Sequence, residues 1–122
     1  MLYRRGVGLV LAVALIGLAG CIYIANILPV ASFTVSDPHV DSGEVVSFDA
    51  SGSYDPDGTI ASYLWDFDDG QTPSTTIFPL TTHVFTVQTD PAEVFRVTLT
   101  VTDNRGGTDS EWRDITVEPV VP

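Results

Sequence analysis

The chain has 122 residues, with 16 acidic residues against five Lys and Arg, and a formal net charge of −11 at pH 7. This length supports one domain with a single core, and such an acidic surface repels phosphate backbones, which excludes nucleic acid as a partner. Arg4 and Arg5 lie at the N-terminus, so the rest of the chain sets three arginines against all 16 acids and carries −13. We interpret most of these acids as solubilising.

Residues 1–20 have the pattern of a secretory signal peptide. A short positive region is followed by an uncharged apolar stretch from Gly6 to Leu18, and small residues then precede Cys21. The segment Leu18 to Cys21 resembles the lipobox of bacterial lipoproteins, which implies cleavage before Cys21 and acylation of its sulfur. Cys21 is the only cysteine in the sequence, so it cannot form an internal disulfide. Each buried CH₂ of the acyl chains would contribute about 0.8 kcal/mol to membrane binding.

The alternative is an uncleaved N-terminal helix that stays in the membrane as an anchor. Residues 6–25 contain no charged side chain, and about 20 apolar residues are enough to cross a bilayer core. The two leading arginines would then hold the N-terminus in the cytoplasm. We favour lipidation, because the lipobox match lies at the correct end of the apolar stretch. Both alternatives predict an extracytoplasmic domain that is anchored to the membrane or cell surface.

Beyond the leading segment, apolar and polar residues alternate with a period of two, which is typical of β-strands. The alternation is clear in residues 32–36, 45–50, 63–67, 95–102 and 115–117, and turn-forming residues separate these runs. The pattern predicts an all-β, immunoglobulin-like sandwich of seven strands. Its bounds are residues 29–118, after a short connector at 21–28 and before a tail at 119–122. Burial of aromatic side chains, chiefly Trp65 and Phe95, must hold this core, because no disulfide is available.

Several motifs of this region resemble the PKD domain, an immunoglobulin-like module found in many microbial surface proteins. They are Pro29 to Phe33, Phe48 to Ser53, Asp55-Pro56-Asp57-Gly58, Tyr63-x-Trp65-Asp66-Phe67 with Asp69-Gly70, His83 with Phe85, and Val97 to Gly106. The resemblance covers nearly the whole chain after the leading segment. It implies contact with proteins or carbohydrates, or simple spacing, rather than catalysis.

Two positions depart from the family pattern. Asp68 stands where the family usually has Gly, and we expect the turn to survive because Asp tolerates a left-handed backbone at modest cost. The interval from His83 to Phe95 is several residues longer than usual and contains Pro91. This length predicts a protruding loop or an extended hairpin.

The resemblance also implies a calcium site, because PKD modules of collagenases bind calcium with acids in the matching turns. Carried over to this chain, the ligands would be Asp55, Asp57 and Asp103, with Asn26 as a weaker fourth. Calcium takes about six to eight oxygen ligands, which carboxylates and turn carbonyls supply. The alternative, which we favour, is that these aspartates are turn formers whose side chains bond to their own backbone.

Trp112 is a candidate binding residue at the last predicted strand. If Ile115 and Val117 point inward, the parity of the strand directs Trp112 outward, where an indole can stack on a sugar or a partner side chain. A β-bulge would reset the parity and bury Trp112. We favour the bulge.

The sequence contains no set of residues that is typical of catalysis. It has no phosphate loop, no Gly-x-Ser-x-Gly motif, no Cys–His pair and no lysine, and His39 and His83 lack metal-ligand spacing. We expect His83 to be a packed, hydrogen-bonded residue. The sequence therefore predicts a non-catalytic module that binds protein or carbohydrate, and the alternative is a passive, calcium-stabilised subunit of a surface assembly.

Overall fold

The computed structural model describes residues 14–16 and 22–120, and all regular elements in these ranges are β-strands. The strands are β1 (Ala14–Ile16), β2 (Ile22–Ile24), β3 (Thr34–Val35), β4 (His39–Asp41), β5 (Val45–Asp49), β6 (Ile60–Asp66), β7 (Ser74–Thr76), β8 (Leu80–Val84), β9 (Glu93–Asp103) and β10 (Thr108–Glu118).

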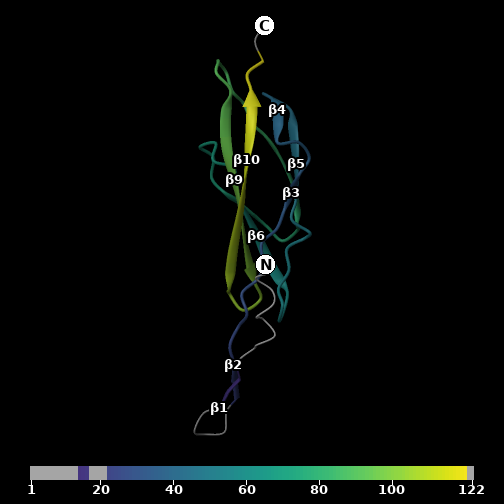
Figure 1. The fold of residues 1–122 in the computed structure, drawn as a ribbon, viewed down its shortest axis with the longest axis vertical. Coiled ribbons are helices and arrows are strands. Elements are labelled where there is room, and N and C mark those ends of the chain that lie inside the picture. The colour runs from purple at the N-terminus through teal and green to yellow at the C-terminus, as the bar shows by residue number, and fades with distance from the viewer. Residues whose placement is uncertain (1–13, 17–21, 121–122) are drawn as a thin grey trace, which may run out of the picture.

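Strands β3 to β10 form two sheets that pack face to face (Figure 1). The larger sheet has the order β4-β10-β9-β6-β7, and the smaller sheet has the order β3-β5-β8. The pairing of β4 with β10 is parallel, and the other pairs in both sheets are antiparallel. The predicted immunoglobulin-like sandwich is confirmed. It has eight strands rather than seven, because short strands such as β4 and β7 show no alternation in the sequence.

The core lies between the two sheets and is built from the predicted alternating side chains. Trp65 is fully buried at its centre, where the indole meets the edge of the Phe33 ring at a centroid distance of 5.3 Å and lies 5.6 Å from Phe48. Phe95 is also buried and stacks on Phe85 at 4.9 Å. The prediction that aromatic burial holds the core is confirmed. The indole Nε1 of Trp65 has no hydrogen-bond partner within residues 22–120.

Both departures from the family pattern have a clear structural form. Asp68 adopts a φ of 57°, so the left-handed turn is confirmed. The segment between β8 and β9 connects two different sheets, so the alternative of an extended hairpin is wrong. Val87 within this segment is buried, and its N–H donates to Ser42 Oγ at 2.8 Å. Residues 88–91 form an exposed loop at the tip of the segment.

Cys21 and most of the predicted signal segment lie outside the described residues. The described part of this segment, β1, pairs antiparallel with β2. Figure 1 shows this hairpin beyond one end of the sandwich, whereas β10 finishes at the opposite end. No helix within residues 14–16 and 22–120 is long and apolar enough to cross a membrane.

Candidate functional site

The four residues predicted as calcium ligands lie together at the end of the sandwich that the chain enters from β2. The side-chain amide of Asn26 donates to Asp103 Oδ2 at 2.7 Å, and the N–H of Ile27 donates to Asp57 Oδ2 at 2.9 Å. Asp55 belongs to the same turn as Asp57, whose N–H lies 3.5 Å from Asp55 Oδ1. The side chains therefore fasten the first residues of the domain to two turns that are remote in the sequence.

Asp103 is the buried centre of this cluster and the last residue of β9. Its Oδ1 accepts backbone N–H bonds from Arg105 and Gly107, both at 2.8 Å. Burial alone would raise the pKa of Asp103, but the bonds from Asn26 and these two N–H groups outweigh burial and lower the pKa. Asp103 is therefore ionised and shapes its own turn, as the turn-former interpretation predicts.

Two oxygens of the cluster have no such partner. Asn26 Oδ1 and Asp55 Oδ2 are buried and accept no hydrogen bond from the described residues. Burial raises the pKa of Asp55, and the neighbouring Asp57 and Asp103 carboxylates raise it further. A buried acceptor without a donor is costly, so these two oxygens would be stabilised by a hydrogen-bond donor or by a cation.

Two glycines make room for the cluster, although sequence reasoning treated them only as turn residues. A Cβ atom at Gly58 would lie 2.6 Å from Asp55 Oδ2, and one at Gly107 would lie 2.7 Å from Asp103 Oδ2. Asn104 links the two turns, because its Oδ1 accepts the N–H of Thr59 at 3.1 Å. The need for space beside these carboxylates is visible in the sequence as the glycine at the end of each acidic turn.

The donor types of the cluster suit a hard cation, although its present geometry is not a closed cage. Carboxylate and amide oxygens are the ligands that calcium prefers, and the two unpartnered oxygens belong to this class. However, no group of three or more His, Cys, Asp or Glu side chains in the described part of the chain is arranged to hold a metal ion.

Trp112 lies on the outer face of the larger sheet and is 52% exposed. The pairing of β10 with β9 runs without a shift from Thr108 opposite Thr102 to Val117 opposite Glu93. The favoured prediction of a bulge that buries Trp112 is therefore wrong, and the parity of the strand turns the indole outward. The irregularity in this sheet lies instead between Ile60 and Ser62 of β6.

The surroundings of Trp112 are polar and carry hydroxyl groups. The guanidinium of Arg96 lies over the indole ring, 3.7 Å from its centroid. Along the same two strands, the hydroxyls of Thr100 and Ser110 share a hydrogen bond of 2.7 Å. Sequence reasoning missed Arg96, because its approach to Trp112 depends on the register between β9 and β10.

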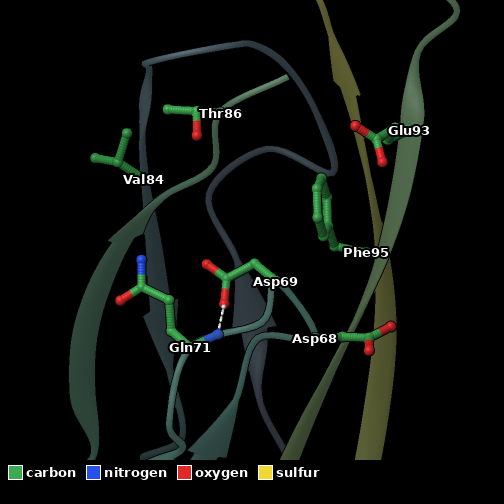
Figure 2. Close-up of a pocket in the computed structure, with 7 residues that line it drawn as sticks. All are labelled: Asp68, Asp69, Gln71, Val84, Thr86, Glu93 and Phe95. Atoms are coloured by element: carbon green, nitrogen blue, oxygen red, sulfur yellow. Dashed lines mark hydrogen bonds between the residues drawn. The ribbon is translucent and has the colours of Figure 1, made fainter. Parts of the chain in front are cut away.

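A separate cavity of about 370 Å³ lies between the end of β8 and the start of β9 (Figure 2). Its lining is mainly polar and acidic, and consists of Asp68, Asp69, Gln71, Val84, Thr86, Glu93 and Phe95. Asp69 is held by two bonds, one from the N–H of Gln71 at 3.2 Å and one with His83 Nε2 at 2.6 Å. The His83 ring stacks on Phe67 at 3.8 Å, which confirms His83 as a packed, hydrogen-bonded residue.

The two packed sheets, with the orders β4-β10-β9-β6-β7 and β3-β5-β8, define an immunoglobulin-like β-sandwich module. Residues 26–117 match the PKD domain family. The chain belongs to this family. PKD domains are non-catalytic accessory modules that occur in extracellular or secreted proteins.

Individual relatives agree with this assignment. The chain is 41% identical over 93 residues to the pre-pro-metalloprotease PrtV of Vibrio cholerae. The matched region spans 76% of this chain but only 9% of that protease. The PKD1 domain of Vibrio anguillarum Epp is 34% identical with a TM-score of 0.61, and the match covers 79% of this chain and 100% of that chain. A PKD domain can therefore fold on its own.

A further solved structure concerns the promiscuous specificity of carbohydrate-binding modules from the β-sandwich superfamily. It is 38% identical to this chain with a TM-score of 0.72, and the match covers 80% of this chain and 37% of that chain.

Proposed function

We propose that this protein is a membrane-anchored, extracytoplasmic binding module that contacts neutral carbohydrate through the sheet face around Trp112. The observation that carries this proposal is the half-exposed indole of Trp112 on the outer face of the larger sheet. Arg96 covers one face of this ring, and the uncovered part of the indole offers an apolar plane on which a sugar ring can stack. The likeness to a structure concerned with carbohydrate-binding modules supports the same ligand class.

The charge of the domain narrows the class of glycan. The chain from Asn26 onward has a formal net charge of −13, which repels acidic sugars such as uronates. Neutral glycans present hydroxyls, which match the donors and acceptors beside Trp112, namely Arg96, Asp114, Thr100 and Ser110. A protein partner that uses the same indole is the competing occupant.

A pull-down with the soluble domain, residues 26–122, tests the proposal. The parent domain should sediment with insoluble neutral polysaccharides. The Trp112→Ala variant should stay in the supernatant. Val94→Ala is the matched control, because Val94 is exposed on β9 of the same sheet and should leave retention unchanged. Equal retention of the parent domain and Trp112→Ala would remove the glycan role of this face.

We place the membrane anchor at Cys21, with a diacylglycerol on its sulfur. Mass spectrometry of detergent-extracted protein should show a chain that begins at an acylated Cys21. The Cys21→Ser variant should lose the lipid and keep its signal segment. An intact N-terminus at Met1 in the parent protein would instead establish the uncleaved anchor.

A second candidate role is a calcium-stabilised spacer, which the unpartnered Asn26 Oδ1 and Asp55 Oδ2 favour. Asp55, Asp57, Asp103 and Asn26 would hold the ion, and calcium would supply the positive charge that these oxygens lack. The turn that carries Asp103 already contacts the end of β2, because Arg105 donates to the carbonyl oxygen of Ile24 at 2.8 Å. Calcium would therefore stiffen the junction between the anchor and the domain.

A further inference from the structure

Strand β8 is an open edge of the smaller sheet. It pairs with β5 on one side and is the last strand of the order β3-β5-β8. The side chains of Leu80, Thr82 and Val84 are all exposed, and Leu80 reaches 62% exposure. Natural proteins usually protect such an edge with charged residues or a bulge, because it is a template for pairing with another strand. β8 has neither a Lys, Arg, Asp or Glu nor a register shift.

The backbone of this edge offers its hydrogen-bonding groups in a symmetric pattern. The N–H of Ala50 donates to the carbonyl of Pro79 at 2.9 Å. Hydrogen-bonded pairs alternate along an antiparallel ladder, so the residues of β8 that bond to β5 are Thr81 and His83. The N–H and C=O groups of the other three residues, Leu80, Thr82 and Val84, therefore point away from the sheet.

The sequence around β8 contains no acidic or basic residue other than histidine. Residues 71–89 contain no Asp, Glu, Lys or Arg, although the domain around them carries −13. The stretch also exposes Ile77 and Phe78, the latter to 67%. A second copy can therefore approach along this segment without placing carboxylates of the two copies against each other, whereas most other strands of the domain carry acids.

We propose that β8 is a self-association edge, at which a second copy of this chain pairs antiparallel through its own β8. A twofold axis at Thr82 places Thr82 opposite Thr82 of the second copy and Leu80 opposite its Val84. In each of these pairs, both residues have N–H and C=O groups that point out of their own sheet. Each pair would therefore form two N–H···O=C hydrogen bonds across the dimer. The contact is isologous, and it closes as a dimer.

The exposed side chains on the outer face of the joined sheet also suit this pairing. Leu80 lies opposite Asp49 within one copy, and Val84 lies opposite Val45. In the dimer, a row across the joined sheet would read Asp49 and Leu80 of one copy, then Val84 and Val45 of the other. This row would place three apolar side chains in contact as cross-strand neighbours. The two Asp49 carboxylates lie at opposite corners, about 14 Å apart across the strands alone, so salt screens their repulsion.

This pairing reverses one copy relative to the other. The β2 ends of the two copies therefore point in opposite directions, since the strands of the sandwich follow its long axis (Figure 1). Copies anchored side by side in one membrane could not form it. The dimer would form between facing surfaces or between free domains, and it uses a different sheet from the glycan face.

Sedimentation velocity of the soluble domain, residues 26–122, tests the proposal. The sedimentation coefficient should rise with concentration from monomer to dimer, and added salt should strengthen the dimer because both copies are acidic. Val84→Lys should give a monomer at all concentrations. Val94→Lys is the matched control, because it adds the same charge at an exposed valine of the opposite sheet and should still dimerise.

Cysteine cross-linking checks the register in the same domain, which contains no cysteine of its own. Under oxidation, Thr82→Cys should form a disulfide-linked dimer, because facing residues lie about 5.5 Å apart between Cα atoms. Ser47→Cys, one strand farther from the axis, should not. A domain that stays monomeric, a dimer that Val84→Lys leaves intact, equal cross-linking at both cysteines, or capture of an unrelated peptide strand at β8 by a monomer would each overturn the proposal.

Discussion

The guanidinium of Arg96 lies over the indole ring of Trp112, 3.7 Å from its centroid, and its Nε and Nη2 donate to the Asp114 carboxylate at 2.9 and 3.2 Å. Arg96 lies on β9, whereas Trp112 and Asp114 lie on β10, so the stack fastens the two longest strands together. A cation over an aromatic face is attracted by the ring quadrupole. The stack therefore gives the exposed indole a fixed orientation before any ligand arrives, which reduces the entropy lost on binding.

The first prediction concerns this stack. Arg96→Ala should increase the quenching of Trp112 fluorescence by acrylamide, because it uncovers one face of the ring. The free energy of unfolding should change little, since the ion pair is exposed. Arg113→Ala is the control, because Arg113 lies over Phe33 rather than Trp112 and should leave the quenching unchanged. Identical quenching in both variants would mean that Arg96 does not cover the indole in solution.

The stack should also respond to acid. The hydrogen bond from Arg96 lowers the pKa of Asp114. A carboxyl with a lowered pKa contributes its stabilisation above its ordinary pKa and loses it as the pH falls through the lowered value. Quenching of Trp112 should therefore stay constant from neutral pH to below 3.8, the ordinary pKa of Asp, and rise only as the pH falls through the lowered pKa of Asp114.

The second prediction concerns the acidic cluster. Without calcium, Asp55→Asn should keep or raise the melting temperature at neutral pH, because it removes a buried charge that Asp57 and Asp103 repel. With calcium at about 100 times its dissociation constant, the parent domain should gain about 2.7 kcal/mol, and the variant should gain much less. Differential scanning calorimetry with and without EDTA measures both effects. An unchanged parent melting temperature at millimolar calcium would eliminate the site.

The calcium effect should have a defined pH dependence. The pKa of Asp55 is raised above the ordinary 3.8 by burial. Its proton favours the folded state, so this contribution is present at low pH and is lost as the pH rises through the raised pKa. Calcium needs the ionised form. The rise in melting temperature that calcium causes should therefore shrink as the pH falls toward that value.

The third prediction concerns the core. Trp65→Ala should lower the free energy of unfolding by about 3–5 kcal/mol, because it leaves a cavity among fully buried aromatic rings. Trp65→Phe should cost clearly less, since the indole Nε1 has no hydrogen bond to lose. Urea denaturation measures both variants. An equal loss in the two variants would contradict the cavity account, because only Trp65→Ala removes the whole aromatic ring.

The fourth prediction concerns the turn at Asp68. Asp68→Gly should raise the free energy of unfolding by up to about 1 kcal/mol, because glycine adopts the positive φ of this position without steric cost. Asp68→Ala should lower it, since alanine keeps the steric cost and loses the polar side chain. A ranking with alanine above glycine would contradict the strained backbone.

The sequence predicted the parts of the fold that depend on alternation and burial. Val97, Leu99 and Val101 alternate with threonines over a long run, and all three are fully buried. β4 and β7 have three residues each, which is too short for a period of two to emerge. Their position depends on pairing with β10 and β6, which is a tertiary effect.

The candidate sites were predicted less completely, for two physical reasons. The acidic turns were visible because aspartate and glycine have strong turn preferences, but the buried, unpartnered oxygens of Asn26 and Asp55 depend on a contact between residues 77 positions apart. The outward direction of Trp112 follows from simple parity, but a bulge leaves no reliable mark in a single sequence. The approach of Arg96 then depends on the register, in which Trp112 faces Thr98.

An NMR titration of the isotope-labelled domain, residues 26–122, with a soluble neutral oligosaccharide tests the binding role most directly. We expect concentration-dependent shifts that centre on the Trp112 indole N–H and extend to Arg96 and Ser110, while the Trp65 indole N–H stays unchanged. Shifts that centre on the cavity beside Asp69, or no shifts at millimolar ligand for any neutral glycan, would contradict carbohydrate binding at this face.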